Sequence, residues 1–188
     1  ILEHFPNAVI LRPSVMFGPE DNFFNRFAGM TRMGPVLPIV GGQTRFQPVF
    51  VDDVAAAAEK AVKGEAAPGI YELGGPDVQT FRELMQDMLT VIQRRRMIVN
   101  IPFWIAGVMG TVFDAGSAMT GGLVSAPLTR DQVTSLRSDN VVAEGAKTFA
   151  DLRITPTAME VVLPQYLWRF RQTGQYADIT ASARNLRT

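Results

Sequence analysis

Three short apolar segments, each separated from the next by a stretch long enough for a helix, constrain the fold of this chain more than any other feature. They cover residues 8–11, 49–51 and 70–73. A continuous apolar run of this length is typical of a strand buried on both faces of a parallel sheet. Strands that alternate with helices favour an α/β fold. We therefore predict part of a Rossmann-like, doubly wound parallel sheet, followed by a mainly helical C-terminal third.

The helices are indicated by capping signals and by apolar residues at helical spacing. Three capping-box spacings occur, in Thr80 with Glu83, Thr129 with Gln132, and Thr157 with Glu160. Apolar residues recur every three or four positions after the first of these, which predicts the best-supported helix of the chain. Asp21 is a further candidate N-cap, and Pro164 is expected to kink or restart the last helix.

Composition excludes several kinds of site. The chain of 188 residues carries 18 basic and 18 acidic side chains, which argues against nucleic acid as a partner. It has no Cys, and its only histidine is His4. Disulfides, thiol catalysis, cysteine-ligated zinc and any site that needs two histidines are therefore excluded, and no metal site is predicted.

The sequence also lacks the two motifs that dinucleotide-dependent catalysis would need. The nearest approach to a glycine-rich turn is Gly107-Val108-Met109-Gly110, which has no third glycine and does not follow a strand. A tyrosine base activated by a lysine one helical turn later is also missing. Residues Gly75, Phe170 and Thr180, and not lysine, stand four positions after the three tyrosines. No catalytic residue is predicted in this chain.

Three charged or apolar runs each allow two interpretations. Asp52 and Asp53 could form a paired-carboxylate site, but a helix N-terminus is the simpler interpretation. Arginines 94–96 could bind phosphate or anionic lipid, but cations at a helix C-terminus are favoured. The apolar stretch 101–113 is too short to span a membrane. A helix that covers a pocket or a partner is favoured over an anchor at the membrane surface.

Four segments resemble landmarks of a known family. Residues 10–19, with the sequence ILRPSVMFGP, are similar to the strand and loop after the catalytic helix of extended short-chain dehydrogenase/reductases, also called NAD-dependent epimerase/dehydratases. Segments 49–55, 70–75 and 80–84 resemble the next landmarks, in the correct order. The resemblance covers roughly residues 5–95.

Further segments resemble an atypical branch of this family, which includes the nucleotide-binding accessory subunit of respiratory complex I. These segments are 47–51, 128–133, 138–140 and the helical tail 156–176. In sugar-nucleotide epimerases, an arginine five residues before the valine of the Asp-bearing strand holds a phosphate. Phe46 occupies that place here, and Arg45 is one residue away. This departure disfavours a sugar-nucleotide substrate.

The resemblance implies that the chain is part of a longer protein. The family's glycine-rich turn and Tyr-Lys pair lie upstream of the segment that matches residues 10–19, and the chain begins at Ile1 rather than Met. We expect the C-terminal portion of an NAD(P)-binding protein. Residues 1–75 would supply the last strands and helices of the nucleotide-binding domain, and residues 76–188 the mainly helical substrate-side region and C-terminal extension.

The same resemblance implies a set of site residues. The loop Pro13, Ser14 and Val15 would face the nicotinamide end of the cofactor, largely through backbone groups. The neighbouring substrate pocket would be lined by Asn22, Phe23 and Gln47, with Arg45 as an anion contact. Phe23 also fits a role as an ordinary member of the core.

The expected function is that of a non-catalytic accessory protein of complex I type, in which NADP or NAD stabilises a docking fold. Its partners would be the dinucleotide and subunits of a respiratory complex. An uncovered sheet edge would also allow self-association. The alternative is an NAD(P)-dependent reductase, epimerase or dehydratase acting on an apolar, quinone-like substrate or on a nucleotide sugar. Since no export signal is visible, the expected location is cytoplasmic. Peripheral contact with the inner membrane face is left open.

Overall fold

The computed structural model describes residues 1–108 and 134–172. Its strands are β1 (Val9–Pro13), β2 (Met16–Phe17), β3 (Val36–Val40), β4 (Arg45–Phe46), β5 (Val49–Phe50), β6 (Gly69–Leu73), β7 (Gln79–Thr80) and β8 (Met97–Ile101). Its helices are α1 (Phe24–Met30), α2 (Val51–Val62), α3 (Phe81–Val91) and α6 (Met159–Leu167), with the 3-10 turns η1 (Phe149–Leu152) and η2 (Trp168–Phe170). A further helical segment covers residues 103–108.

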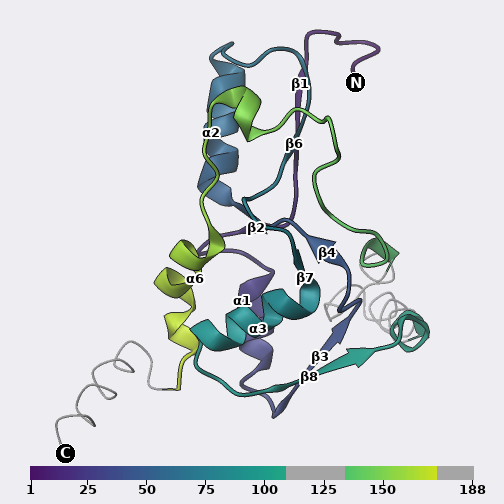
Figure 1. The fold of residues 1–188 in the computed structure, drawn as a ribbon, viewed down its shortest axis with the longest axis vertical. Helices are drawn as coiled ribbons and strands as arrows, with labels where there is room; N and C mark the ends of the chain where they lie inside the picture. Colours follow the sequence, from purple (N-terminus) through teal and green to yellow (C-terminus); the bar gives the residue numbers. More distant parts are fainter. Residues whose placement is uncertain (109–133, 173–188) are drawn as a thin grey trace, which may run out of the picture.

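The strands form four pairs, and three of these are parallel. β1 runs parallel to β6, β2 to β5, and β3 to β8, whereas β4 and β7 are antiparallel. In Figure 1, α2 lies beside the β1–β6 pair, and α1, α3 and α6 lie in the other half of the molecule. Parallel pairs joined through helices confirm the predicted α/β class.

Each half of the molecule is stabilised by its own hydrophobic cluster. The small cluster lies between α2 and the β1–β6 pair and consists of Val49, Ala57, Ala66, Tyr71, Leu73, Phe149 and Leu152. The large cluster packs α1, α3 and α6 against each other, with fully buried members that include Phe24, Leu84 and Leu163. Each cluster combines residues from before and after residue 75, so distant parts of the chain share each core.

One extended segment is hydrogen-bonded to both halves. Asn140 forms a parallel bridge with Phe46 of β4, and Lys147 forms one with Tyr71 of β6. The Asn140 N–H donates to the Arg45 carbonyl at 2.8 Å, and the Glu72 N–H donates to the Lys147 carbonyl at 2.8 Å. Residues 140–147 are therefore bound to both halves of the molecule.

The structure bears out some local predictions and corrects others. The Thr80–Glu83 capping box is present at the start of α3. Asp52 and Asp53 lie in the first turn of α2, as the helix N-terminus interpretation requires. Val51, predicted to end a strand, is instead the first residue of α2. The side chain of Asp21 does not occupy the N-cap position, but its Oδ1 accepts a hydrogen bond from the Asn25 N–H in α1 at 3.0 Å.

The predicted capping box of α6 is wrong. The helix begins one residue after Ala158, which has no side-chain capping hydrogen bond, and it runs through Pro164. The Thr157 hydroxyl and N–H instead donate to the Asp53 carboxylate at 3.1 and 2.6 Å. The third predicted capping box, Thr129 with Gln132, lies outside the described residues, as does the tail from residue 176.

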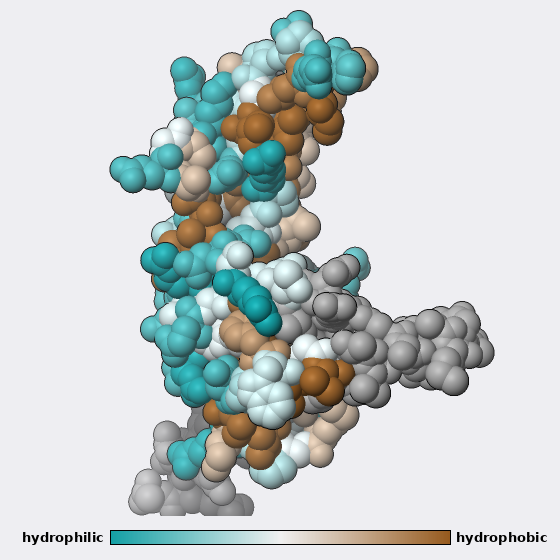
Figure 2. All heavy atoms as spheres, turned by 90° about the vertical axis from the view of Figure 1, so that its right-hand side faces the viewer, coloured by the Kyte–Doolittle hydropathy of each residue, from teal (hydrophilic) through white to brown (hydrophobic). Residues whose placement is uncertain are grey.

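One edge and one face of the β1–β6 pair are left open. Among the described residues, β1 pairs with β6 at one edge and with no strand at the other. Figure 2 shows hydrophobic side chains gathered over the upper part of the molecule, on the side that α2 does not cover. Ile1 and Phe5, just before β1, are 80% and 69% exposed.

None of the helices that the structure describes has the length and hydrophobicity needed to span a lipid bilayer.

Candidate nucleotide site at the strand ends

The loop predicted to face a cofactor lies at the carboxyl end of a parallel strand pair. Pro13 is paired with Leu73, and the Ser14 N–H donates to the Leu73 carbonyl at 2.9 Å. In open α/β sheets, ligands bind outside the carboxyl ends of the strands. The geometry therefore places Pro13, Ser14 and Val15 at the edge where such a fold binds its ligand.

Most polar groups of this loop are hydrogen-bonded to other parts of the protein, but one backbone N–H is not. The Ser14 hydroxyl donates to the Asn140 carbonyl at 2.9 Å, and the Val15 carbonyl accepts from the Val49 N–H at 3.0 Å. The Val15 N–H has no hydrogen-bond partner among the described residues. A donor left over at the carboxyl ends of the strands fits a ligand with acceptor oxygens or an amide.

Gln47 joins three segments around the same edge. Its Nε2 donates to the Gly75 carbonyl at 2.8 Å, and its Oε1 accepts from the Val142 N–H at 3.0 Å. Its backbone N–H donates to the Asn140 carbonyl at 3.1 Å. Both polar atoms of the Gln47 side chain are thus hydrogen-bonded. Gln47 therefore has a positioning role between β4, β6 and the 140–147 segment.

The two glycines after β6 are required by the close approach of this neighbouring segment. A Cβ on Gly74 would lie 2.5 Å from the Gln47 Cδ, and one on Gly75 would lie 1.9 Å from the Pro48 carbonyl oxygen. Both distances are shorter than any real Cβ contact. The Gly-Gly pair therefore allows residues 47–48 to pack against the strand end.

Arg45 forms an ion pair with Asp139. Its Nε and terminal NH2 lie 2.9 and 2.8 Å from the Asp139 Oδ2, and its backbone N–H donates to the Oδ1 at 2.8 Å. The hydrogen bonds from the Arg45 backbone and side chain hold the pKa of the Asp139 carboxyl below its usual value. The Arg45 side chain is 60% exposed. Its charge is matched, so an anionic ligand would have to compete with a carboxylate.

Phe23 lies in an aromatic cluster. Its ring centre is 5.0, 5.6 and 5.7 Å from those of Phe24, Phe81 and Phe27, and 6.1 Å from that of Phe46. Phe23 is only partly buried, whereas its neighbour Asn22 is exposed. Phe46 itself is buried in β4, whereas Arg45 before it is exposed, so the cluster forms an apolar wall at this strand. This placement supports the interpretation of Phe23 as part of the core margin.

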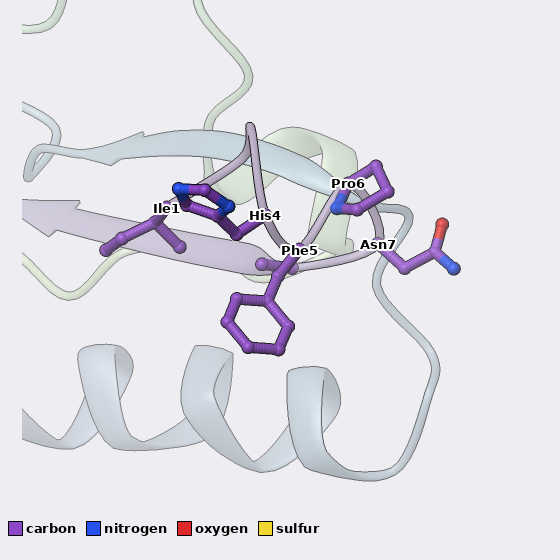
Figure 3. Close-up of a pocket in the computed structure, with 6 residues that line it drawn as sticks. Ile1, His4, Phe5, Pro6 and Asn7 are labelled. Atoms are coloured by element: carbon purple, nitrogen blue, oxygen red, sulfur yellow. The ribbon is translucent and has the colours of Figure 1, made fainter.

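A hollow in the surface lies at the opposite end of β1 from these residues. It is lined by residues of the amino-terminal segment, Ile1, His4, Phe5, Pro6, Asn7 and Ala8. In Figure 3, Ile1 and His4 lie beside each other and Asn7 points away from them. One continuous segment supplies the whole lining, and the described residues contain no group of three potential metal ligands. The hollow is therefore not part of the strand-end site.

The residues that tie this edge together were not all predicted. Asp139 and Asn140 contact Arg45, Ser14 and Gln47, but they lie more than 90 positions later in the chain than Arg45. Residues 138–140 stood out only as part of a family resemblance. No spacing rule relates them to residues 14 or 47, because the contact depends on the path of the whole chain.

Comparison with known proteins identifies what the chain resembles. It is 35% identical over 187 residues, 97% of its length, to "NADH dehydrogenase [ubiquinone] 1 alpha subcomplex subunit 9, mitochondrial" of Arabidopsis thaliana. The chain is thus similar to subunit 9 over nearly its whole length. It is also 31% identical over 92% of its length to the "NADH-ubiquinone oxidoreductase 40 kDa subunit, mitochondrial" of Neurospora crassa. The chain covers 46% and 44% of these two proteins, so it spans less than half the length of either.

The chain is also similar, more weakly, to an enzyme. Over 119 residues, 61% of the chain, it is 29% identical to a ceramide reductase of Caulobacter vibrioides, of which it covers 37%. No family model matches the chain.

Solved structures share the predicted fold with this chain. UDP-glucose 4-epimerase of Thermotoga maritima superimposes on 92% of the chain with a TM-score of 0.59 and 20% identity, and half of that enzyme is covered. dTDP-glucose 4,6-dehydratase of Bacillus anthracis superimposes on 85% of the chain with a TM-score of 0.56 and 15% identity, with 43% of the enzyme covered. The chain therefore shares the α/β fold of these two enzymes over most of its length.

Proposed function

We propose that this chain is the C-terminal portion of an NAD(P)-binding accessory protein of complex I type. Similarity to subunit 9 along 97% of the chain carries the proposal, because the relatives' names place them in NADH dehydrogenase. The strand-end geometry supports it independently. A loop with a spare N–H donor stands at the carboxyl end of β1, where folds of this kind bind their ligands.

In this proposal the cofactor is NADP or NAD, and most of its site lies outside this chain. Pro13, Ser14 and Val15 would contact the nicotinamide end, with the Val15 N–H as the donor. When bound, the dinucleotide would fill the strand-end edge and so stabilise the fold. Residues 1–75 would complete the nucleotide-binding domain, and residues 76–188 would form the substrate-side region and extension.

The substrate-side residues fit a docking or apolar role better than a sugar-nucleotide role. Phe23 would offer an apolar wall, and Asn22 would lie at its exposed margin. Arg45 and Gln47 are already engaged by Asp139 and by the Gly75 carbonyl. A nucleotide-sugar phosphate would therefore find no uncompensated cation at Arg45.

The alternative is an NAD(P)-dependent reductase, and the similarity to a ceramide reductase is the observation that favours it. Catalysis would require a Tyr-Lys pair from outside this chain. Tyr166 cannot serve as the base, because its hydroxyl donates to the Asp21 carboxylate and burial raises its pKa strongly. A Tyr-x-x-x-Lys motif upstream of Ile1 would favour the enzyme, and its absence the accessory role.

The test uses the full-length protein in two experiments. In the first, NADPH and NADH are titrated while nicotinamide fluorescence is followed, with residues 1–188 as the comparison. We expect saturable binding to the full-length protein only. Saturation by residues 1–188 would contradict the assignment of most of the site to a missing half.

In the second experiment, an affinity tag on the chromosomal copy reports the partner. We expect the tagged protein to comigrate with NADH dehydrogenase subunits on a native gel of gently solubilised membranes. Such a result would also support a location at the inner face of the membrane. Migration as a free protein that reduces a lipid or quinone with NADPH would instead establish the reductase.

A further inference from the structure

Five arginines gather where three helical elements end. Arg32 follows α1, Arg94, Arg95 and Arg96 follow α3, and Arg169 lies in η2 after α6. Figure 1 shows the ends of α3 and α6 close together in the lower half of the molecule. We call these five residues the arginine cluster.

Phe170 stands at the centre of the arginine cluster. The guanidinium carbons of Arg32 and Arg169 lie 4.8 and 5.3 Å from the centre of its ring. The Arg94 Nε donates to the Phe170 carbonyl at 2.7 Å, and an Arg32 NH2 donates to the Arg169 carbonyl at 2.7 Å. Two guanidinium groups thus lie against the Phe170 ring, and a third is hydrogen-bonded to the Phe170 backbone.

Arg96 and Arg95 extend the cluster along the chain toward β8. The Arg96 Nε donates to the Thr31 carbonyl at 2.9 Å, which brings it beside Arg32. Arg95 is exposed, and its side chain makes no hydrogen bond or ion pair with a described residue. Of the five, Arg95 is therefore the one with no structural role in the described part of the chain.

In the part of the chain that the structure describes, no carboxylate forms an ion pair with these arginines. The three ion pairs among the described residues are Arg45–Asp139, Lys60–Glu65 and Lys63–Glu59, and none includes a cluster member. Burial, together with the charges of Arg96 and Arg32, lowers the pKa of Arg94. The chain as a whole is neutral, with 18 basic and 18 acidic residues, so the cluster reflects placement and not an excess of arginine.

Hydrogen bonds to helix-end carbonyls explain only part of this arrangement. Each guanidinium carries five N–H donors, and Arg94 uses one of them on a described residue. Arg96 uses two, on Thr31 and on the Arg95 carbonyl. Arg32 uses one, on the Arg169 carbonyl, and Arg169 donates to the Pro19 carbonyl and the Asn25 Oδ1, so most donors of the cluster have no hydrogen-bond partner among the described residues. Their concentration without acids is typical of a surface that meets several anionic groups at once.

Exposed apolar side chains border the cluster. Met33 and Met97 are 81% and 68% exposed, and they lie one position after Arg32 and Arg96 in the chain. The Met97 N–H donates to the Pro35 carbonyl, which holds the two segments together. Trp168, next to Arg169, is 38% exposed. Arginines interleaved with methionine and tryptophan match a lipid interface, where the charges meet headgroups and the apolar groups enter the acyl boundary.

We propose that the arginine cluster, with Met33, Met97 and Trp168 beside it, docks the protein onto an anionic lipid bilayer. Charge complementarity selects this occupant, since the surface offers several unmatched cations and apolar groups of adequate size. The proposal does not depend on nucleotide binding or on partnership with NADH dehydrogenase, and its test uses neither.

The test is flotation of the full-length protein with vesicles of phosphatidylcholine alone or of equal parts phosphatidylcholine and phosphatidylglycerol. We expect binding to the anionic vesicles only, and weaker binding at higher salt. Arg95→Gln should weaken it about fivefold, which corresponds to about 1 kcal/mol per basic residue near the surface. Arg95→Lys should retain most of the binding, and Met97→Ser should reduce it further in combination with Arg95→Gln.

Arg153→Gln is the matched control. Arg153 is an exposed arginine that follows η1, in the half of the molecule that contains α2. Equal binding by Arg95→Gln and Arg153→Gln would overturn the proposal. So would equal binding to neutral vesicles, or displacement by low concentrations of inorganic phosphate or of a short DNA duplex. The unfolding midpoint of each variant, which we expect to be unchanged for Arg95→Gln, verifies that the fold is intact.

Discussion

The Asp139 carboxylate is held by Arg45 on two sides, through the guanidinium at 2.8 Å and through the backbone N–H at 2.8 Å. The two residues are 94 positions apart in the chain. The pair therefore fastens the start of the 140–147 segment to β4, next to the residues proposed to line the substrate side.

Acid should weaken this contact. The Asp139 pKa is lowered in the folded protein from about 3.8, so its stabilising effect is complete above that value and is lost as the pH falls through the folded pKa. We expect Asp139→Asn to lower the urea midpoint at pH 7, and we expect the difference from the unmodified protein to vanish at the lowest pH. Asp77→Asn, at an exposed position, is the control. A difference that persisted unchanged into strong acid would contradict this role of the carboxylate.

Asp53 and Asp52 should differ in their contribution to stability, although both lie in the first turn of α2. Only Asp53 accepts hydrogen bonds from Thr157, through its N–H and its hydroxyl. Asp53→Ala should lower the free energy of unfolding by about 2 kcal/mol, because hydrogen bonds to a charged acceptor are lost. Asp52→Ala should change it by less than about 0.5 kcal/mol. Equal losses in urea denaturation would mean that both residues act only on the helix dipole.

Gly75 should not tolerate a methyl group. A Cβ there would lie 1.9 Å from the Pro48 carbonyl oxygen, so Gly75→Ala must displace backbone. We expect a loss of about 1–3 kcal/mol in the free energy of unfolding, together with weaker dinucleotide binding by the full-length protein. Gly34→Ala is the control, because nothing lies within 4 Å of its Cβ position. Thermal unfolding that left both variants alike would refute the close approach of residues 48 and 75.

The start of α3 should depend on Thr80. Its hydroxyl accepts from the Glu83 N–H, and the Glu83 carboxylate accepts from the Thr80 N–H at 2.7 Å. Thr80→Ala should cost about 1 kcal/mol in the free energy of unfolding. Thr90→Ala, near the other end of the helix, should cost less than about 0.5 kcal/mol, because its hydroxyl bonds only to the Gln86 carbonyl. Equal costs would show that the capping box adds nothing.

The two helix starts at Thr80 and Thr157 show what a local sequence pattern can and cannot predict. The Thr80 capping box was predicted correctly because every partner lies within four residues. The same spacing at Thr157 failed, since Asp53 lies 104 positions away and takes both donors. A local sequence pattern contains no information about a competing hydrogen-bond acceptor that is close only in the folded chain.

The same limit applies to the strands and to the site residues: local features were predicted, and contacts between distant segments were not. β1 and β6 were predicted from their apolar runs, whereas β8 was missed because it follows three arginines and its partner β3 lies far back in the chain. At the site, Ser14 and Gln47 were anticipated as site residues through a family resemblance. Their common partner, the Asn140 carbonyl, could be found only in the folded chain.

The 140–147 segment has a consequence for how the molecule can move. It is bridged to β4 at one end and to β6 at the other, and these strands belong to different halves. The two halves therefore cannot hinge apart unless backbone hydrogen bonds at one end of the segment break. A few glycines inserted between residues 140 and 147 would lengthen this tie, and the hydrogen bonds between Thr157 and Asp53 would then remain as a direct link between the halves.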